Sequence, residues 1–428
     1  MHNTHIQWLG DVPATWDIRR LKYCVDLIND KVDSPPEGER YIGLENIESH
    51  TGRVFWPDEN GTAEGFCSIF KPGDVLFGKL RPYLAKVIVA KNSGVCTSEL
   101  LVFRPRLVEA KYLWYFLLSD GFIKTVDSST YGAKMPRASW DFIGNLPMLL
   151  PSIDEQKSIH RFLDSQTAQL DELIALKVKQ IELLGIKRQT IISQAVTRGL
   201  NPEVPMKPSG LAWLGVIPEH WLTWRIKYLS SKIGSGKTPR GGAEVYSDDG
   251  IIFLRSQNIY DDGLRLEDVV FIDETIDEEM AETRIQIGDV LLNITGASIG
   301  RTCVVPEDFP RANVNQHVCI IRPKRTKVLD HFLAYCLKAT SVKDQINSFE
   351  NGSSRQGLNF EQIGNLLVVS PTNIEEQQGI IDYLNHETAR LDQVINYINI
   401  QIDLLRQYRQ TLIANAVTGK IDVRGVVV

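Results

Sequence analysis

The stretch GSGKT at residues 234–238 contains a Gly-Lys-Thr triplet of the kind that binds nucleotide phosphates. A phosphate-binding loop also needs a glycine separated from that triplet by four residues, and a helix that begins behind the loop. Here that position is Ser231, and Pro239 after the triplet disfavours a helical conformation at Thr238. The sequence therefore argues against a nucleotide site.

Other combinations of residues also fall short of a catalytic site. SPPE at 34–37 approaches the Pro-Pro-aromatic loop of amino methyltransferases, but Glu37 replaces the aromatic residue that stacks on a flipped base. Pro57, Asp58 and the segment EAK at 109–111 mimic parts of a nuclease site, but they are far apart in the sequence. Because no Ser/His/Asp group or paired carboxylates stand out, the sequence predicts a non-catalytic binding protein.

The amino-acid composition narrows the class of protein further. The six cysteines form no CxxC pair and the eight histidines show no metal-binding spacing, so we expect neither disulfides nor a metal or cofactor in this chain. The absence of a long apolar run or an apolar leader predicts a cytoplasmic protein. The net charge of −6 argues only weakly against a nucleic-acid partner, since affinity follows the local patch that faces the phosphates.

The strongest pattern is an internal repeat, in which motifs of the first half recur in the same order in the second half. The opening WLGDVPATWDIRRLKY at 8–23 recurs as WLGVIPEHWLTWRIKY at 213–228. Three further pairs follow: GDVLF at 73–77 with GDVLL at 288–292, IGNLPMLLPSIDEQ at 143–156 with IGNLLVVSPTNIEEQ at 363–377, and RQTIISQAVTRG at 188–199 with RQTLIANAVTGK at 409–420. A repeat of this length predicts a duplicated pair of domains.

Each copy divides into a globular part and a helical part. Glycine, proline, tryptophan and short β-type runs predict strand-rich α/β domains at 1–150 and 201–371. Capping boxes that follow a proline, Ser152 with Glu155 and Thr372 with Glu375, predict helix starts. The expected long helices occupy residues 151–200 and 372–428.

Both helical parts carry apolar residues at alternating spacings of three and four, which favours a coiled-coil seam. The expected seam residues are Leu163, Leu170, Ile174, Ile181, Leu184 and Ile191 in the first helix, and Leu384, Leu391, Ile395, Ile398, Ile402, Leu405 and Leu412 in the second. Lys177 interrupts the first row. The seam rows also contain Thr167, Thr388, Arg188 and Arg409, which we interpret as residues that fix the register, with a partner-binding role as the alternative.

The linker at 197–210 is short and contains proline, so it cannot return the chain along a whole helix. We therefore expect the two helices to be antiparallel. The predicted fold class is α+β: two strand-rich α/β globular domains separated by two long antiparallel coiled-coil helices, related by a pseudo-twofold internal repeat.

Loops of both globular parts combine arginine and lysine with asparagine, glutamine and serine. Arginine reads guanine, asparagine or glutamine reads adenine, and lysine or serine binds phosphates, so these loops predict a DNA-binding surface. The candidates in the first domain are Lys79, Arg81, Tyr83, Lys134 and Arg137. Those in the second are Lys237, Arg240, Arg255, Gln257, Asn258, Arg301, Asn315, Gln316, His317, Ser354, Arg355 and Gln356.

Taken together, the paired openings, the GDVL motifs, NITGASIGR, NVNQHV and the matching helix starts and ends resemble the DNA-specificity (S) subunits of type I restriction–modification systems. The resemblance covers nearly the whole chain. It implies that each globular domain is a target-recognition domain that reads one half of a split, asymmetric DNA site, and that the helices set the gap. By the same likeness, GSGKTP matches a Gly-rich loop of a recognition domain, which makes Lys237 a candidate DNA contact.

The resemblance also implies partners. Two methyltransferase (M) subunits would hold the chain and methylate an adenine in each half-site with S-adenosylmethionine, and motor-nuclease (R) subunits would use ATP and Mg²⁺ to restrict unmodified DNA. The first domain has FGKLRPYL at 77–84 where the second has NITGASIG at 293–300, so we expect the two domains to read different sequences.

Two other functions remain open from the residues alone. A two-headed coiled-coil scaffold could bind proteins through both globular parts without DNA specificity. A self-sufficient methyltransferase or nuclease is disfavoured by the missing catalytic motifs.

Overall fold

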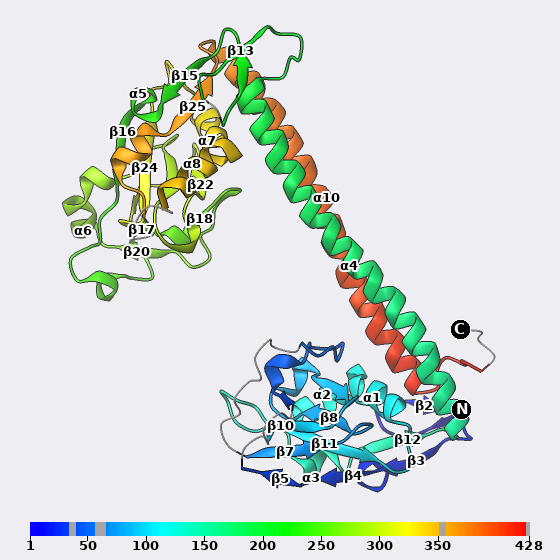
Figure 1. The fold of residues 1–428 in the computed structure, drawn as a ribbon. Helices are drawn as coiled ribbons and strands as arrows, with labels where there is room; N and C mark the ends of the chain where they lie inside the picture. The colour runs from blue at the N-terminus through cyan, green and yellow to red at the C-terminus, as the bar shows by residue number, and fades with distance from the viewer. Residues whose placement is uncertain (34–39, 56–65, 212, 351–356, 425–428) are drawn as a thin grey trace. The chain divides into compact units, whose positions relative to one another are not determined.

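The computed structural model describes residues 1–33, 40–55, 66–211, 213–350 and 357–424. Residue contacts divide the chain into two units, Met1–Val178 with Asn399–Val428, and Lys179–Ile398. Two long helices, α4 (Ile153–Arg198) and α10 (Ile374–Val417), are each divided between the two units. Figure 1 shows both helices as single continuous elements.

The globular part of the first unit is built on two four-stranded sheets. One has the order β4 (Val25–Ile28), β11 (Leu100–Pro105), β8 (Val75–Gly78) and β9 (Val87–Val89), and is covered by α1 (Ala110–Leu118) and α2 (Asp120–Ser128). The other has the order β5 (Lys31–Val32), β7 (Cys67–Phe70), β10 (Gly94–Thr97) and β6 (Tyr41–Ile42). Two strand pairs, β1 (His2–Asn3) with β2 (Asp11–Val12) and β3 (Asp17–Arg20) with β12 (Pro147–Leu150), and α3 (Trp140–Ile143) complete it.

The second unit repeats this plan. Its main sheet has the order β16 (Ser230–Ser235), β24 (Val318–Pro323), β21 (Val290–Asn293) and β22 (Thr302–Val304), beside α7 (Asp330–Lys338) and α8 (Thr340–Glu350). A three-stranded sheet follows the order β20 (Val270–Ile272), β17 (Ile251–Leu254) and β23 (Ala312–Val314). The strand pairs are β13 (Met206–Pro208) with β14 (Val216–Pro218), β15 (Leu222–Arg225) with β25 (Leu367–Ser370), and β18 (Ile259–Tyr260) with β19 (Gly263–Leu264). The helices α5 (Ile226–Leu229), α6 (Glu274–Glu279) and α9 (Phe360–Asn365) are short.

The repeated GDV motif has a structural role in both globular parts. Asp74 is buried and accepts two hydrogen bonds from Arg104, each of 2.8 Å. Asp289 accepts the equivalent pair from Arg322, at 2.7 and 2.8 Å. Because a buried carboxylate is stable only when it is paired and hydrogen-bonded, the motif joins the two central strands of each main sheet, β8 with β11 and β21 with β24.

The repeated opening and the helix ends pack against each other within each unit. A Cβ on Gly419, just after α10, would lie 2.5 Å from Pro13 and 3.0 Å from Trp16, so that helix end abuts the first opening motif. In the second unit Gly199, just after α4, contacts Trp221, whose indole N–H donates to Glu376 at 2.9 Å. Both glycines have positive φ, as expected of a helix C-cap.

Each globular part is joined to the helix that follows it by the same two contacts. Gln156 accepts a hydrogen bond from the N–H of Glu109 at 2.8 Å, and Gln377 accepts one from the N–H of Leu329 at 2.9 Å. The hydroxyl of Tyr115 donates to Asp164 at 3.0 Å, and that of Tyr335 donates to Asn385 at 2.8 Å. The first residues of each long helix are therefore part of the neighbouring globular fold.

One of the two expected capping boxes is present as predicted. The Ser152 hydroxyl accepts from the N–H of Glu155 at 3.3 Å, and Glu155 accepts from the N–H of Ser152 at 3.2 Å. The prediction of Thr372 as the second cap is wrong by one residue. Asn373 caps α10 and accepts from the N–H of Glu375 at 2.8 Å, because Asn373 is the position that aligns with Ser152.

Antiparallel packing of the helices is confirmed. In the first unit Arg409 donates to Asp171 and Lys177 donates to Gln401, so residue numbers rise along α4 as they fall along α10. In the second unit Arg188 donates to Asp392 at 2.6 Å. All predicted seam residues are buried or half-buried. The predicted fold class, with its mixed globular parts, long helices and internal repeat, is confirmed.

Candidate nucleic-acid interface

Two loops of the first globular part carry all of its predicted DNA-binding residues, and backbone hydrogen bonds hold these loops together. The N–H of Arg81 donates to the carbonyl of Pro136 at 2.8 Å, and the N–H of Ala138 donates to Lys79 at 2.9 Å. Leu80 and Arg137 form a β-bridge. Residues 79–83 and 134–137 therefore form one surface, on which Arg81, Tyr83 and Lys134 are exposed.

Arg137 already has an anionic partner within this surface. Its guanidinium lies 3.0 Å from the carboxylate of Glu99, and both are half-buried. The hydrogen bonds that Arg137 donates to the Glu99 carboxylate raise the pKa of Arg137. Arg137 therefore positions the loop, and Arg81, Tyr83 and Lys134 are the side chains that solvent reaches.

The GSGKT stretch of the second globular part leads from β16 into a loop and not into a helix. A Cβ on Gly236 would lie 1.7 Å from the carbonyl oxygen of Val314, and the N–H of Gly236 donates to Val318 at 3.2 Å. Only glycine can approach that backbone so closely. The motif therefore packs against the loop between β23 and β24, which carries NVNQH.

Side-chain hydrogen bonds then join three loops of this part. Thr238 donates to the amide oxygen of Gln316 at 2.5 Å, and the amide nitrogen of Gln316 lies 3.0 Å from Nε2 of His317. Nδ1 of His317 lies 2.6 Å from the hydroxyl of Thr295. Lys237 and Arg240 are exposed beside this chain of contacts, and Lys237 lies 3.4 Å from the exposed Glu282.

Two of the residues predicted to contact bases, Asn258 and Asn315, instead form hydrogen bonds with backbone groups of the protein. Asn258 is buried, accepts from the N–H of Arg255 at 2.9 Å and donates to the carbonyl of Arg265 at 2.9 Å. Asn315 is also buried and accepts from the N–H of His317 at 3.1 Å. Arg255 donates to the carbonyl of Asp268 at 2.7 Å, whereas Gln257 is exposed.

Arg301 lies in a different setting from the other predicted residues. Its guanidinium stacks 4.7 Å from the ring centre of Tyr260, and it lines a cavity of about 780 Å³ between this globular part and the helices of the same unit. Lys338 lines the same cavity, where burial lowers its pKa. Arg301 therefore does not join the loop surface around Gln316.

Several residues of interest lie outside the residues that the structure describes. These are the predicted contacts Ser354, Arg355 and Gln356, and the stretches 34–37 and 57–58.

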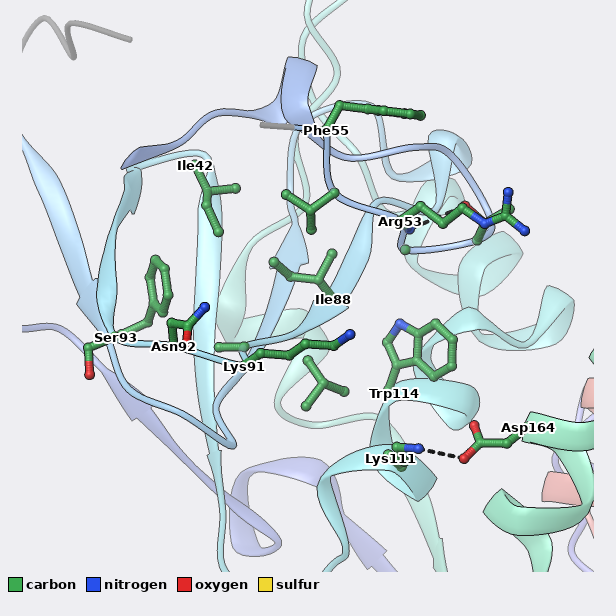
Figure 2. Close-up of a pocket in the computed structure, with 16 residues that line it drawn as sticks. Ile42, Arg53, Phe55, Ile88, Lys91, Asn92, Ser93, Lys111, Trp114 and Asp164 are labelled. Carbon is green, nitrogen blue, oxygen red and sulfur yellow. Dashed lines mark hydrogen bonds and ion pairs between the residues drawn. The ribbon is translucent and has the colours of Figure 1, made fainter. Parts of the chain in front are cut away.

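A second cavity, of about 590 Å³, lies in the first unit and contains none of the predicted DNA-binding residues. Figure 2 shows Trp114 beside the ion pair in which Lys111 donates to Asp164 at 2.5 Å. Burial alone would raise the pKa of Asp164, but His160, whose Nδ1 lies 3.7 Å away, and the hydrogen bonds from Lys111 and Tyr115 lower it to about 2. This cluster stabilises the junction between α1 and α4.

The acidic segment of the second globular part is partly structural. Asp277 is fully buried, and it accepts hydrogen bonds from Arg284 at 2.8 Å, from Asn313 at 2.9 Å and from Arg311. Burial opposes ionisation, but these donors outweigh it and lower the pKa of Asp277. Asp277 thus neutralises Arg284 and Arg311.

Sequence reasoning did not single out a set of exposed apolar residues on the long helices. They lie at heptad positions beside the seam and recur at equivalent places in both helices: Leu173 with Val394, Leu176 with Tyr397, and Leu183 with Leu404. In an antiparallel pair these positions flank one side of the seam. Each unit therefore has one apolar patch, of Leu173, Leu176 and Leu404 in the first and of Leu183, Val394 and Tyr397 in the second.

The described part of the chain contains neither a metal-binding group nor a membrane-spanning helix. Across residues 1–33, 40–55, 66–211, 213–350 and 357–424, no three histidine, cysteine or acidic side chains come together as a metal site. Within the same residues, no helix combines the length and apolar character needed to cross a bilayer.

The family described as the type I restriction modification DNA specificity domain matches this chain at residues 47–183 and 218–404. These two matches follow the internal repeat and together cover more than half of the chain. The chain belongs to this family.

Curated members of this specificity family are similar over much of the chain. The type I restriction enzyme EcoBI specificity subunit of Escherichia coli is 26% identical over 77% of this chain and 69% of its own length. The MjaVIII specificity subunit of Methanocaldococcus jannaschii is 23% identical over 96% of this chain and 94% of its own length.

Solved structures share the fold. A chain from a study of complex assembly and conformational transition of the type I R-M system aligns with a TM-score of 0.71 at 16% identity, covering 96% of this chain and all of that one. The HsdS subunit of Thermoanaerobacter tengcongensis aligns with a TM-score of 0.51 at 18% identity, covering 98% of this chain and 100% of its own.

Proposed function

We propose that this chain is the DNA-specificity subunit of a type I restriction–modification complex. The observation that carries the proposal is the presence of two equivalent loop surfaces, one in each globular part, on the same strand framework. In both, a loop after the central strand hydrogen-bonds to the turn beside it: the N–H of Lys79 donates to Glu99 at 3.0 Å, and that of Ile294 donates to His317 at 3.0 Å. Each surface reads one half of a split DNA site.

The two surfaces carry different side chains at equivalent positions. Ser98 and Glu99 form the turn in the first part, where the second part has Gln316 and His317. Glu99 holds Arg137, whereas His317 contacts Gln316. Because base edges are distinguished by the pattern of donors and acceptors that meets them, the two parts read different half-sites.

The contacts of each surface fall into two classes. Four exposed basic residues contact phosphates and set the register on the duplex: Arg81, Lys134, Lys237 and Arg240. Gln257 and Gln316, which are exposed amides, contact base edges. Asn258 and Asn315 are buried and support the surface from behind.

The apolar patches on the helices bind two methyltransferase subunits, one in each unit. Support comes from their recurrence at equivalent heptad positions, since exposed apolar clusters on a soluble helix pair mark interaction sites. Methyl transfer, with S-adenosylmethionine, and restriction, with ATP and Mg²⁺, belong to the methyltransferase and motor-nuclease partners. This chain acts as a non-catalytic, cytoplasmic subunit, and its helices set the number of base pairs between the half-sites.

Fluorescence anisotropy with a labelled random-sequence duplex, across a salt series, tests DNA binding. We expect the affinity to fall by at least about tenfold between about 50 and about 200 mM salt, because phosphate contacts release counterions. A charge reversal at Lys237 should reduce the slope, whereas Lys179→Glu, a surface change on α4, should not. The rival scaffold function predicts no binding to the duplex at either salt concentration.

A further inference from the structure

The side chain of Gln316 is held in one orientation by the chain of contacts through three loops of the second globular part. Its amide oxygen accepts from Thr238 at 2.5 Å, and its amide nitrogen donates to Nε2 of His317 at 3.0 Å. That assignment requires the proton of the neutral imidazole on Nδ1, where it is donated to Thr295 at 2.6 Å. The carbonyl of His317 is fixed in turn by the N–H of Ile294 at 3.0 Å.

An exposed glutamine normally samples many rotamers and both amide orientations. Here the amide is bound on both sides, by the Thr238 hydroxyl on one and by Nε2 of His317 on the other, so its position is fixed. A primary amide has two acceptor lone pairs and two N–H donors. The protein uses one of each, so one acceptor and one donor remain on an exposed side chain.

One acceptor beside one donor matches the major-groove edge of adenine, which offers the N6 amino donor and the N7 acceptor. Guanine offers two acceptors there and cannot satisfy the amide oxygen. We infer that Gln316 reads an adenine in the half-site of the second globular part, and that Thr238, His317 and Thr295 are positioning residues for that contact. This inference rests on the proposed DNA-specificity function.

The first globular part supports the assignment by contrast. The equivalent turn holds Ser98 and Glu99, and Glu99 binds Arg137, so no amide is presented there. Changes at Gln316 therefore affect only one half-site, and the other half-site serves as an internal control.

The test is selection of bound sequences from a random duplex library, using the full chain in complex with a methyltransferase subunit of its system. Wild-type complex should select two separated sequences. Gln316→Arg should convert one adenine of one half-site to guanine, because arginine binds the two acceptors of guanine. Gln316→Ala should lower discrimination at that base pair by about 10- to 100-fold, equivalent to the loss of one bidentate contact.

The positioning role of Thr238 is tested separately, by the discrimination at the base pair that Gln316 contacts. Thr238→Val should relax discrimination at the same base pair and at no other, and Thr238→Ser should restore it. If wild type selects a split site and Gln316→Arg leaves every base unchanged, the assignment of Gln316 is wrong while DNA specificity stands. If wild type itself selects no sequence, the proposed function fails.

Discussion

Arg409 on α10 donates to Asp171 on α4 at 2.9 Å, and the repeat places an equivalent ion pair between Arg188 and Asp392. The two pairs differ in their surroundings. The Arg409 side chain is 6% exposed and also donates to the carbonyl of His50 at 3.1 Å, whereas the Arg188 side chain is 29% exposed and lines the cavity of the second unit. The same arginine in each helix thus fixes the register in both units, and Arg409 also binds a globular loop through the carbonyl of His50.

This difference predicts unequal effects of the same substitution. Arg409→Ala removes the shorter of the two ion pairs of Asp171 and leaves Arg53 at 3.6 Å, so it should lower the free energy of unfolding by about 2–3 kcal/mol. Arg188→Ala should cost about 1 kcal/mol or less, as more exposed pairs do. Urea unfolding of the two variants measures both values. Equal losses of unfolding free energy in the two variants would show that the contact with His50 and the deeper burial of Arg409 do not contribute to stability.

The Asp164 cluster predicts a loss of stability in acid. Because its pKa in the folded chain is about 2, below the ordinary value of 3.8, ionised Asp164 stabilises the fold above pH 3.8. That contribution disappears as the pH falls from about 4 towards 2. Asp164→Asn should therefore be less stable than wild type by about 1 kcal/mol at pH 6, after allowance for its partial exposure, and the difference should shrink at pH 3. A difference that stays constant over this range would contradict the assignment.

Gly236 should not tolerate a side chain. The Cβ of Gly236→Ala would overlap the carbonyl of Val314, so the loop must shift away from Gln316. We expect that variant to lose discrimination in the half-site of the second globular part while the other half-site is unchanged. Gly234→Ala is the matched control, because its Cβ would meet only the flexible end of Lys232 at 3.9 Å. Sequencing of selected duplexes distinguishes the two.

The apolar patches predict the stoichiometry of the complex. Leu183→Asp and Leu404→Asp occupy equivalent positions in different units, so each should reduce the bound methyltransferase subunits from two to one. The control is Ile186→Asp on α4, an exposed apolar residue whose equivalent in α10 is Gln407. Light scattering after gel filtration gives the mass of each complex. Retention of two subunits in both patch variants would exclude these patches as binding sites.

Much of the fold could be predicted because the repeated motifs have structural roles. Asp74 and Asp289 bind a strand arginine, Trp221 binds the start of α10, and Gly199 ends α4. Such contacts constrain residue type at fixed places, so they leave a readable pattern. The error at Thr372 arose because two adjacent residues, Thr372 and Asn373, can both cap a helix, and only the local geometry selects one.

The candidate site was less predictable. Asn258 and Gln316 look alike as loop amides in the sequence, yet one is buried against backbone groups and the other is exposed. Arg301 follows a Gly-rich loop but turns to stack on Tyr260. These differences depend on contacts between loops distant in the sequence, which residue type and spacing do not encode.

The central claim is that each globular part reads one half of a split DNA site. It is tested most directly by sequencing methylated adenines in DNA from cells that express this chain with its methyltransferase partner. The account predicts one motif made of two different short sequences separated by a fixed gap, with a methylated adenine in each. A single uninterrupted motif, or methylation that does not depend on this chain, would contradict it.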